Sequence, residues 1–159
     1  KAGFQIMGDW AKGEFTAAGK VPGVDYYCAP TPSNNGYLYN VDSFIFYKTS
    51  DPDKQEGQKL LAKLMMGKNF QKVFNLYKGS IPARLDVPMD EFDKCAKTSN
   101  SDIKTAGASG GLVPSFAHGM AQGNTMKAAL QDIITEHFNS DMSSVDAANA
   151  LADSVLANM

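Results

Sequence analysis

The chain has 159 residues, of which 43% are hydrophobic and 20% charged, and its formal net charge at pH 7 is −2. This composition is typical of a folded domain and argues against a disordered chain. The near-neutral charge and the single arginine, Arg84, argue against a nucleic-acid-binding surface, and no run of 18 apolar residues is present that would span a membrane.

The first residues predict structure at once. No charged segment followed by an apolar one marks a signal peptide after Lys1, and Ala2–Met7 has the pattern of a short buried strand. Either a signal peptide has already been removed, or Lys1 lies partway through a longer protein. We favour the second interpretation, because the strand pattern begins without the polar lead-in that is usual at a natural terminus. Gly8 and Asp9 then predict a helix with Asp9 as its N-cap, which ends near Gly19.

Two further strands are predicted early in the chain, at Asp25–Ala29 and Asp42–Lys48, and Leu112–Pro114 predicts a short extended piece. Helical spacing of apolar residues and capping residues predict most of the remainder. One expected helix follows Asp51-Pro52 as far as Gly67, another covers Asn69–Tyr77, and a third begins around Pro88–Cys95. Two more are expected at Gly123–Asn139, with Ile134 and Phe138 inside, and at Ser143–Met159, with Ser143 or Ser144 as cap.

The order of elements predicts an α/β fold, with a few early strands and a mostly helical second half. Three or four short strands make a thin sheet for this number of helices. The rest of the sheet is therefore expected in sequence outside this chain.

Motifs for catalysis and for cofactors are absent from the sequence. There is no G-x-S-x-G turn, no phosphate-binding glycine loop and no zinc-type Cys/His spacing. Four acids between residues 86 and 93 are expected to form a solvated face and a helix first turn rather than a metal site. The two cysteines, Cys28 and Cys95, are compatible with two buried thiols or with one disulfide, and their spacing does not decide between these.

Five polar or aromatic residues remain as candidates for a functional role. His137 is expected to be structural or solvated, whereas His118 lies in a loop that can present its imidazole to a cleft. Trp10 has an ordinary explanation in core packing and Lys78 in charge complementarity at a helix end, and Asp42 is a further polar candidate. Residue chemistry alone leaves them unassigned.

Five ordered segments resemble one family. They are FQIMGDWAKGEF at 4–15, VDSF at 41–44, KGSIPARLDV at 78–87, FDKCA at 92–96 and VPSFAHGMA at 113–121. These segments are similar to the C-terminal part of bacterial extracellular sugar-binding proteins of ABC importers, the family 1 solute-binding proteins, and most of all to the glucose/mannose-binding type. The final FNSDMSSVDAANALADSV also resembles the end of such proteins.

The resemblance implies a periplasmic-binding-protein-like (type II) fold with two lobes around a cleft. Residues 1–159 would then be the C-terminal portion, contributing to both lobes and forming no complete independent domain. The missing N-terminal part of the same protein would supply the other half of the cleft. The implied function is to bind glucose or a similar hexose in the periplasm and deliver it to the membrane permease, without catalysis and without a cofactor.

The resemblance also implies roles for individual residues. Trp10, Lys78 and His118 occupy positions that face the sugar in the glucose-binding relatives, Asp42 lies near a crossing between lobes, and Cys28 and Cys95 are expected to be bridged. We therefore predict that Trp10, Lys78 and His118 converge on one cleft. The alternative function is a carbohydrate-active enzyme or a carbohydrate-binding module. The enzyme would need two carboxylates flanking the sugar, and no motif singles out such a pair.

Overall fold

A computed structural model describes residues 3–32 and 36–158. The chain forms two compact units. The first unit comprises Lys1–Tyr37 and Val41–Leu112, and the second comprises Leu38–Asn40 and Val113–Met159. In the part of the chain that is described, no helix has the length and apolar character that crossing a membrane requires.

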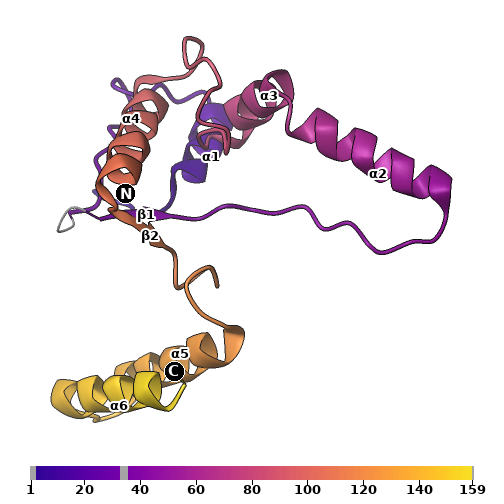
Figure 1. The fold of residues 1–159 in the computed structure, drawn as a ribbon. Coiled ribbons are helices and arrows are strands. Elements are labelled where there is room, and N and C mark those ends of the chain that lie inside the picture. The colour runs from indigo at the N-terminus through magenta and orange to yellow at the C-terminus, as the bar shows by residue number, and fades with distance from the viewer. Residues whose placement is uncertain (1–2, 33–35, 159) are drawn as a thin grey trace. The chain divides into compact units, whose positions relative to one another are not determined.

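Helices make up most of the regular secondary structure of the first unit (Figure 1). A 3-10 turn, η1 (Asp9–Ala11), leads into α1 (Lys12–Ala17), which packs against α3 (Lys68–Lys78). The helix α2 (Pro52–Met65) precedes α3, and α4 (Lys94–Ser109) follows it. The predicted start of α2 is confirmed, because the Asp51 carboxylate accepts hydrogen bonds from the main-chain N–H groups of Asp53 and Lys54.

The core of the first unit is small and lies beside α3 and α4. Val87, Phe92 and Ala96 are its buried members, and Leu76, Ile81 and Met89 pack around them. Pro82 is fully buried. The loop between α3 and α4 supplies five of these seven residues, so its conformation depends on apolar burial as well as on hydrogen bonds.

Two helices dominate the second unit, and both were predicted. α5 (Asn124–Asn139) begins after Gly123, and α6 (Ser144–Ala157) is capped by the Ser143 hydroxyl, which accepts from the Asp146 N–H. They pack against each other, as Figure 1 shows. Two residues expected inside are exposed, however: Ile134 by 56% and Phe138 by 87%.

Strand predictions were less successful. β1 (Tyr37–Tyr39) pairs in parallel with β2 (Leu112–Pro114), which confirms the predicted extended piece at 112–114, whereas β1 was not predicted. Residues 4–8 form no strand, and Ala2 lies outside the described residues. The strand predicted at Asp25–Ala29 is reduced to an isolated bridge between Tyr26 and Pro22. The fold is therefore a mostly helical α/β arrangement with two short parallel strands.

The predicted strand at Asp42–Lys48 is extended in conformation but is not part of a sheet. Phe44 is 61% exposed, Ile45 78% and Tyr47 82%, so apolar side chains on both faces lack a covering layer. Within the described chain, the main-chain groups of Ser43–Phe46 have no hydrogen-bonding neighbour. Figure 1 shows this stretch as a long extended trace between β1 and α2. The local preference for β structure is present, and the pairing strand is not.

One further helix start agrees with prediction and one differs. α4 begins at Lys94, within the predicted start at Pro88–Cys95, where the Asp93 carboxylate caps it by accepting from the Ala96 N–H at 2.8 Å. The weakly patterned stretch Ser99–Ala108 belongs to this helix. At the other helix, Gly8 rather than Asp9 occupies the cap position before η1, and the Asp9 side chain is used elsewhere.

Candidate functional site

Trp10, the chain's only tryptophan, lies in η1 and is half-buried. Its indole folds back over Gly8, so that a Cβ at residue 8 would collide with the six-membered ring. The absence of a side chain at Gly8 therefore allows the indole to lie where it does, and any larger residue there would displace the ring.

Changing Gly8 to Ala should displace this indole. The added methyl group would push the ring away from residue 8, so the tryptophan emission spectrum should change. The free energy of unfolding should fall by about 1 kcal/mol or less. The matched control is Gly57→Ala in α2, where a Cβ meets nothing within 4 Å. That variant should leave the emission unchanged and raise stability by roughly 0.5–1 kcal/mol. An unchanged spectrum for Gly8→Ala would contradict the packing of Trp10 on Gly8.

Asp9 connects the turn that carries Trp10 to the loop after α3. Its Oδ2 accepts a hydrogen bond from the Ile81 N–H at 2.9 Å, across 72 residues of sequence. Burial raises the pKa of the Asp9 carboxyl, against the opposing effects of the Ile81 N–H and of the Lys12 and Lys78 charges. The hydrogen bond therefore joins the turn at η1 to the loop after α3, and the carboxylate that accepts it is partly desolvated.

The Asp9 contact can be tested with two substitutions. Asp9→Ala leaves the Ile81 N–H without its acceptor and should lower the free energy of unfolding by about 1–3 kcal/mol. Asp9→Asn keeps an acceptor oxygen and removes the buried charge, so at pH 7 it should be at least as stable as the parent.

The pH dependence has a definite sign. The pKa of the Asp9 carboxyl is higher in the folded state than in the unfolded state. Above the folded-state pKa the ionised carboxylate therefore disfavours folding, and this disadvantage is relieved as the pH falls through the folded-state pKa. The advantage of Asp9→Asn should therefore shrink on acidification, measured by denaturant unfolding at several pH values. An Asn variant as unstable as the Ala variant would contradict this account.

Two glycines allow α1 to approach the end of α3 closely. Gly79 follows α3 with φ +88°, in the left-handed region, and a Cβ there would come within 2.4 Å of the Gly13 nitrogen. A Cβ on Gly13 would lie 2.7 Å from the Lys78 carbonyl oxygen. Lys78 is the last residue of α3, and Trp10 lies in η1, which leads directly into α1, so the close approach of α1 to α3 sets the position of both segments.

Side chains of α3 hold the loop that follows Lys78. Gln71 accepts from the Ala83 N–H at 3.1 Å and donates to the Met65 carbonyl at 2.8 Å. Asn75 accepts from the Ser80 hydroxyl at 2.8 Å. Both amides are buried, and these hydrogen bonds satisfy their polar atoms while they hold the loop in place.

Lys78 and Asp42, two of the predicted site residues, are brought together. The Lys78 ammonium lies 2.5 Å from the Asp42 carboxylate and 5.8 Å from the centre of the Phe74 ring. The Lys78 side chain is 31% exposed and that of Asp42 67%, so the pair faces solvent. It offers hydrogen-bond donors and acceptors side by side.

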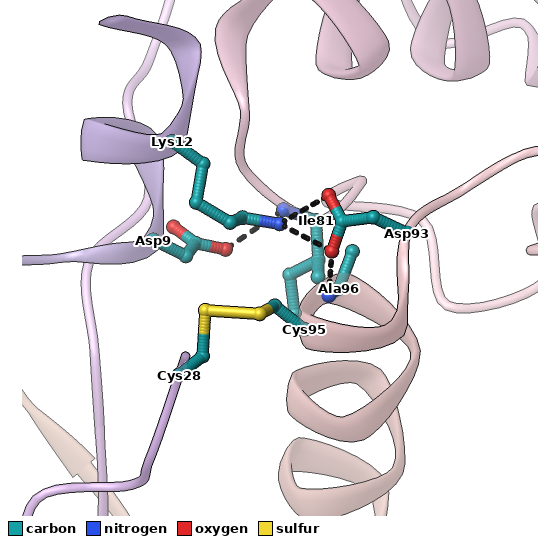
Figure 2. A network of polar contacts seen from close by, with 7 residues as sticks. All are labelled: Asp9, Lys12, Cys28, Ile81, Asp93, Cys95 and Ala96. Atoms are coloured by element: carbon teal, nitrogen blue, oxygen red, sulfur yellow. Dashed lines mark hydrogen bonds and ion pairs between the residues drawn. A yellow bond between two sulfur atoms is a disulfide. The ribbon is translucent and has the colours of Figure 1, made fainter. Parts of the chain in front are cut away.

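A second polar cluster lies beside Asp9 (Figure 2). The Lys12 ammonium, on a side chain only 6% exposed, lies 3.0 Å from the Asp93 carboxylate that caps α4. Beside it, Cys28 and Cys95 form a disulfide with their Cα atoms 5.7 Å apart. The expected bridge is thus present, and it ties the loop after α1 to the first turn of α4.

His118 lies in the second unit, in the turn after β2, and is exposed. Its Nδ1 lies 2.7 Å from the hydroxyl of the buried Ser115. The convergence of His118 with Trp10 and Lys78 stays a prediction. His137 is structural, as expected: its Nδ1 is 2.8 Å from the Met142 carbonyl oxygen at the turn between α5 and α6.

The acid cluster between residues 86 and 93 is only in part the solvated face that was expected. Asp86 pairs with Arg84 at 2.8 Å and Lys68 at 3.0 Å, and these partners, Arg84 foremost, hold the pKa of its carboxyl well below the usual range. Asp93 differs, because its partner Lys12 is buried. Among the described residues, no group of three His, Cys, Asp or Glu side chains is placed to hold a metal ion.

Several residues around the candidate site were not predicted. Asp9 was assigned to a helix cap, and neither Gly8, Lys12 nor Ser115 was given a role. Their partners are distant in sequence or depend on turn geometry, so spacing could not reveal them. Two surface hollows of the first unit, of about 340 and 250 Å³, are lined by none of Trp10, Asp42 or Lys78.

Comparison with known proteins adds independent evidence. No protein-family model matches the chain. It is 45% identical over 98% of its length to a probable sugar-binding periplasmic protein of Brucella suis, and 43% identical over 98% to one of Rhizobium meliloti. It is also 36% identical over 86% of its length to an uncharacterized ABC transporter extracellular-binding protein of Pyrococcus horikoshii, covering 30% of that protein. The chain spans 37% of the length of the Brucella and Rhizobium relatives, so nearly all of it is similar to about one third of proteins named as periplasmic sugar-binding proteins.

Proposed function

We propose that this chain is the C-terminal portion of a periplasmic sugar-binding protein that delivers a monosaccharide, glucose or a similar hexose, to an ABC-type importer. The observation that carries the proposal is the 45% identity over 98% of the chain to a probable sugar-binding periplasmic protein. The relatives are named as binding proteins rather than as enzymes. Its compartment is the periplasm, in agreement with a disulfide, which persists under oxidising conditions.

The chemistry of the candidate residues suits a hexose. A hexose has an apolar face of C–H groups and a rim of hydroxyls. The indole of Trp10 can cover the C–H face. The Lys78 ammonium and the Asp42 carboxylate, which lie next to each other, can donate to and accept from neighbouring hydroxyls. Hydrogen bonds to charged groups are worth about 1.5–3 kcal/mol each, and an unpaired partner in a closed site is penalised by a similar amount. Such a site distinguishes epimers without making or breaking a bond.

The proposal includes the organisation of the whole protein. The chain contributes to both lobes around a sugar cleft, and the N-terminal part of the same protein completes the cleft and the sheet. The uncovered extended segment Ser43–Tyr47 supports this, since it has β character and lacks a neighbouring strand. Closure of the two lobes on the sugar would present both of them to the permease.

Calorimetric titration of glucose, galactose, mannose and xylose into the full-length protein tests the function. Xylose is included because a Haloferax volcanii protein that is 27% identical over 98% of this chain is named as xylose/arabinose-binding. Trp10→Ala, Lys78→Ala and His118→Ala should each weaken binding of the preferred hexose roughly 5- to 150-fold, corresponding to about 1–3 kcal/mol.

The control for Lys78→Ala is Lys59→Ala, which removes an exposed lysine of α2 that pairs with Glu56 and should not change affinity. If all three site variants bind as tightly as the parent, the residue assignment is wrong. If none of the four sugars binds, the proposed ligand class is wrong. Steady turnover of a nitrophenyl glycoside would instead favour the carbohydrate-active enzyme.

A further inference from the structure

We propose that Ser115 is a positioning residue, which fixes the tautomer of His118 so that the imidazole presents Nε2–H as a hydrogen-bond donor to a sugar oxygen. The inference rests on the proposed function, because it assigns the sugar as the group that His118 meets. What it adds is the direction of the hydrogen bond and a residue that controls it.

The main-chain N–H and carbonyl groups of Ser115 are both hydrogen-bonded, which holds the residue in place. Its N–H donates to the Tyr39 carbonyl at 2.9 Å, and its carbonyl accepts from the Met120 N–H at 3.0 Å. The residue is 3% exposed. These contacts anchor Ser115 between the end of β1 and the turn that follows β2, so its hydroxyl is a fixed reference point.

The turn then brings His118 back over Ser115. The Gly119 N–H donates to the Phe116 carbonyl at 2.9 Å, and Gly119 has φ +72°, a conformation that glycine adopts without strain. As a result, the His118 Nδ1 and the Ser115 Oγ, three residues apart, lie 2.7 Å from each other.

The direction of this hydrogen bond follows from what each group needs. If Ser115 donates to an unprotonated Nδ1, its single O–H is satisfied. If Nδ1–H donates instead, the O–H of a buried serine needs another acceptor, and the described structure gives that hydroxyl no partner other than His118. Buried donors are rarely left unpaired. The first arrangement is therefore favoured, and in a neutral imidazole it places the proton on Nε2.

The consequence concerns specificity. An imidazole of undefined tautomer can either donate to or accept from a hydroxyl, whereas one with a fixed Nε2–H demands a lone pair from the ligand. His118 and Lys78 then both act as donors, and Asp42 acts as the acceptor. Sugar oxygens near His118 would be selected for their ability to accept.

Nitrogen NMR of the full-length protein with ¹⁵N-labelled histidine tests the tautomer directly at pH 8, where an ordinary imidazole is neutral. The parent should show His118 with Nδ1 unprotonated and Nε2 protonated. Ser115→Ala should shift His118 toward a mixture of tautomers, and Ser115→Thr, which keeps the hydroxyl, should restore the parent signature. A parent with Nδ1 protonated, or an Ala variant identical to the parent, would overturn the inference. The parent spectrum is decisive even if the Ala variant does not fold.

Sugar titration separates this inference from the proposed function. Ser115→Ala should weaken binding of the preferred hexose roughly 2- to 12-fold, the value of one ordinary hydrogen bond, and should have no further effect in a His118→Ala background. If His118→Ala binds like the parent, the role of His118 in the proposed function fails. If His118→Ala weakens binding and Ser115→Ala does not, the positioning role of Ser115 fails and the proposed function stands.

Discussion

Replacing both Cys28 and Cys95 by alanine should lower the free energy of unfolding by about 4 kcal/mol. The bridge joins residues 67 apart in sequence, so its loss releases a long loop in the unfolded chain, whose entropy then rises. The Cα separation of 5.7 Å is ordinary for a disulfide, which indicates that the native structure accommodates the bridge.

Denaturant unfolding of the full-length protein, oxidised and reduced, measures this effect. The parent under reducing conditions is the matched control, because it lacks the bridge and keeps both side chains. It should unfold at the same denaturant concentration as the double variant. A loss of less than about 1 kcal/mol would show that the two segments are already restricted in the unfolded chain.

The second large effect is expected at Asp93. Asp93→Ala removes the partner of a lysine whose side chain is only 6% exposed, and it also removes the cap of α4. Leaving a buried charge unpaired typically destabilises a protein by about 3–5 kcal/mol, and a lost cap adds about 1 kcal/mol. We expect the total loss to fall below this sum, near 3 kcal/mol, because the Asp93 side chain itself is 34% exposed and water can approach the site.

Two further variants separate the charge from the cap. Asp93→Asn keeps an oxygen that can accept from the Ala96 N–H, so it should lose the charge interaction alone. Adding Lys12→Met to Asp93→Asn removes the unpaired ammonium and should recover part of the stability, because a buried ion pair can be replaced by neutral groups at small net effect. A double variant less stable than Asp93→Asn would contradict the view that the unpaired Lys12 charge is the cause.

The sequence predicts an element of this fold well where the interactions that form the element join residues close together in sequence. α2 and α6 were predicted because the cap residues Asp51 and Ser143 act within three residues of their targets, and α5 because its apolar residues recur at helical spacing. The strands were mostly mispredicted, because a strand exists only with its neighbour, and Asp42–Lys48 has none among the described residues. α4 was missed over most of its length, since its few apolar residues give little periodicity.

The same distinction applies to the candidate site. Trp10, Lys78 and His118 could be named from the sequence only through the family resemblance, and their convergence stays a prediction. Asp9 supports this group through a hydrogen bond to Ile81 that spans 72 residues, for which no spacing rule exists. Ser115 was also missed, although it is three residues from His118, because its role depends on the left-handed turn at Gly119.

The extended segment Ser43–Tyr47 has a consequence for how the protein must be assembled. Open main-chain groups flanked by aromatic side chains on both faces are the features through which chains associate into intermolecular sheets. Association between copies becomes faster with concentration, whereas pairing within one molecule does not. In the organisation proposed above, pairing of this segment with the N-terminal part of the same protein would compete with association between copies and would prevail at low concentration. A high local concentration of nascent chains during secretion would favour association instead, and holding chaperones would protect this stretch from it.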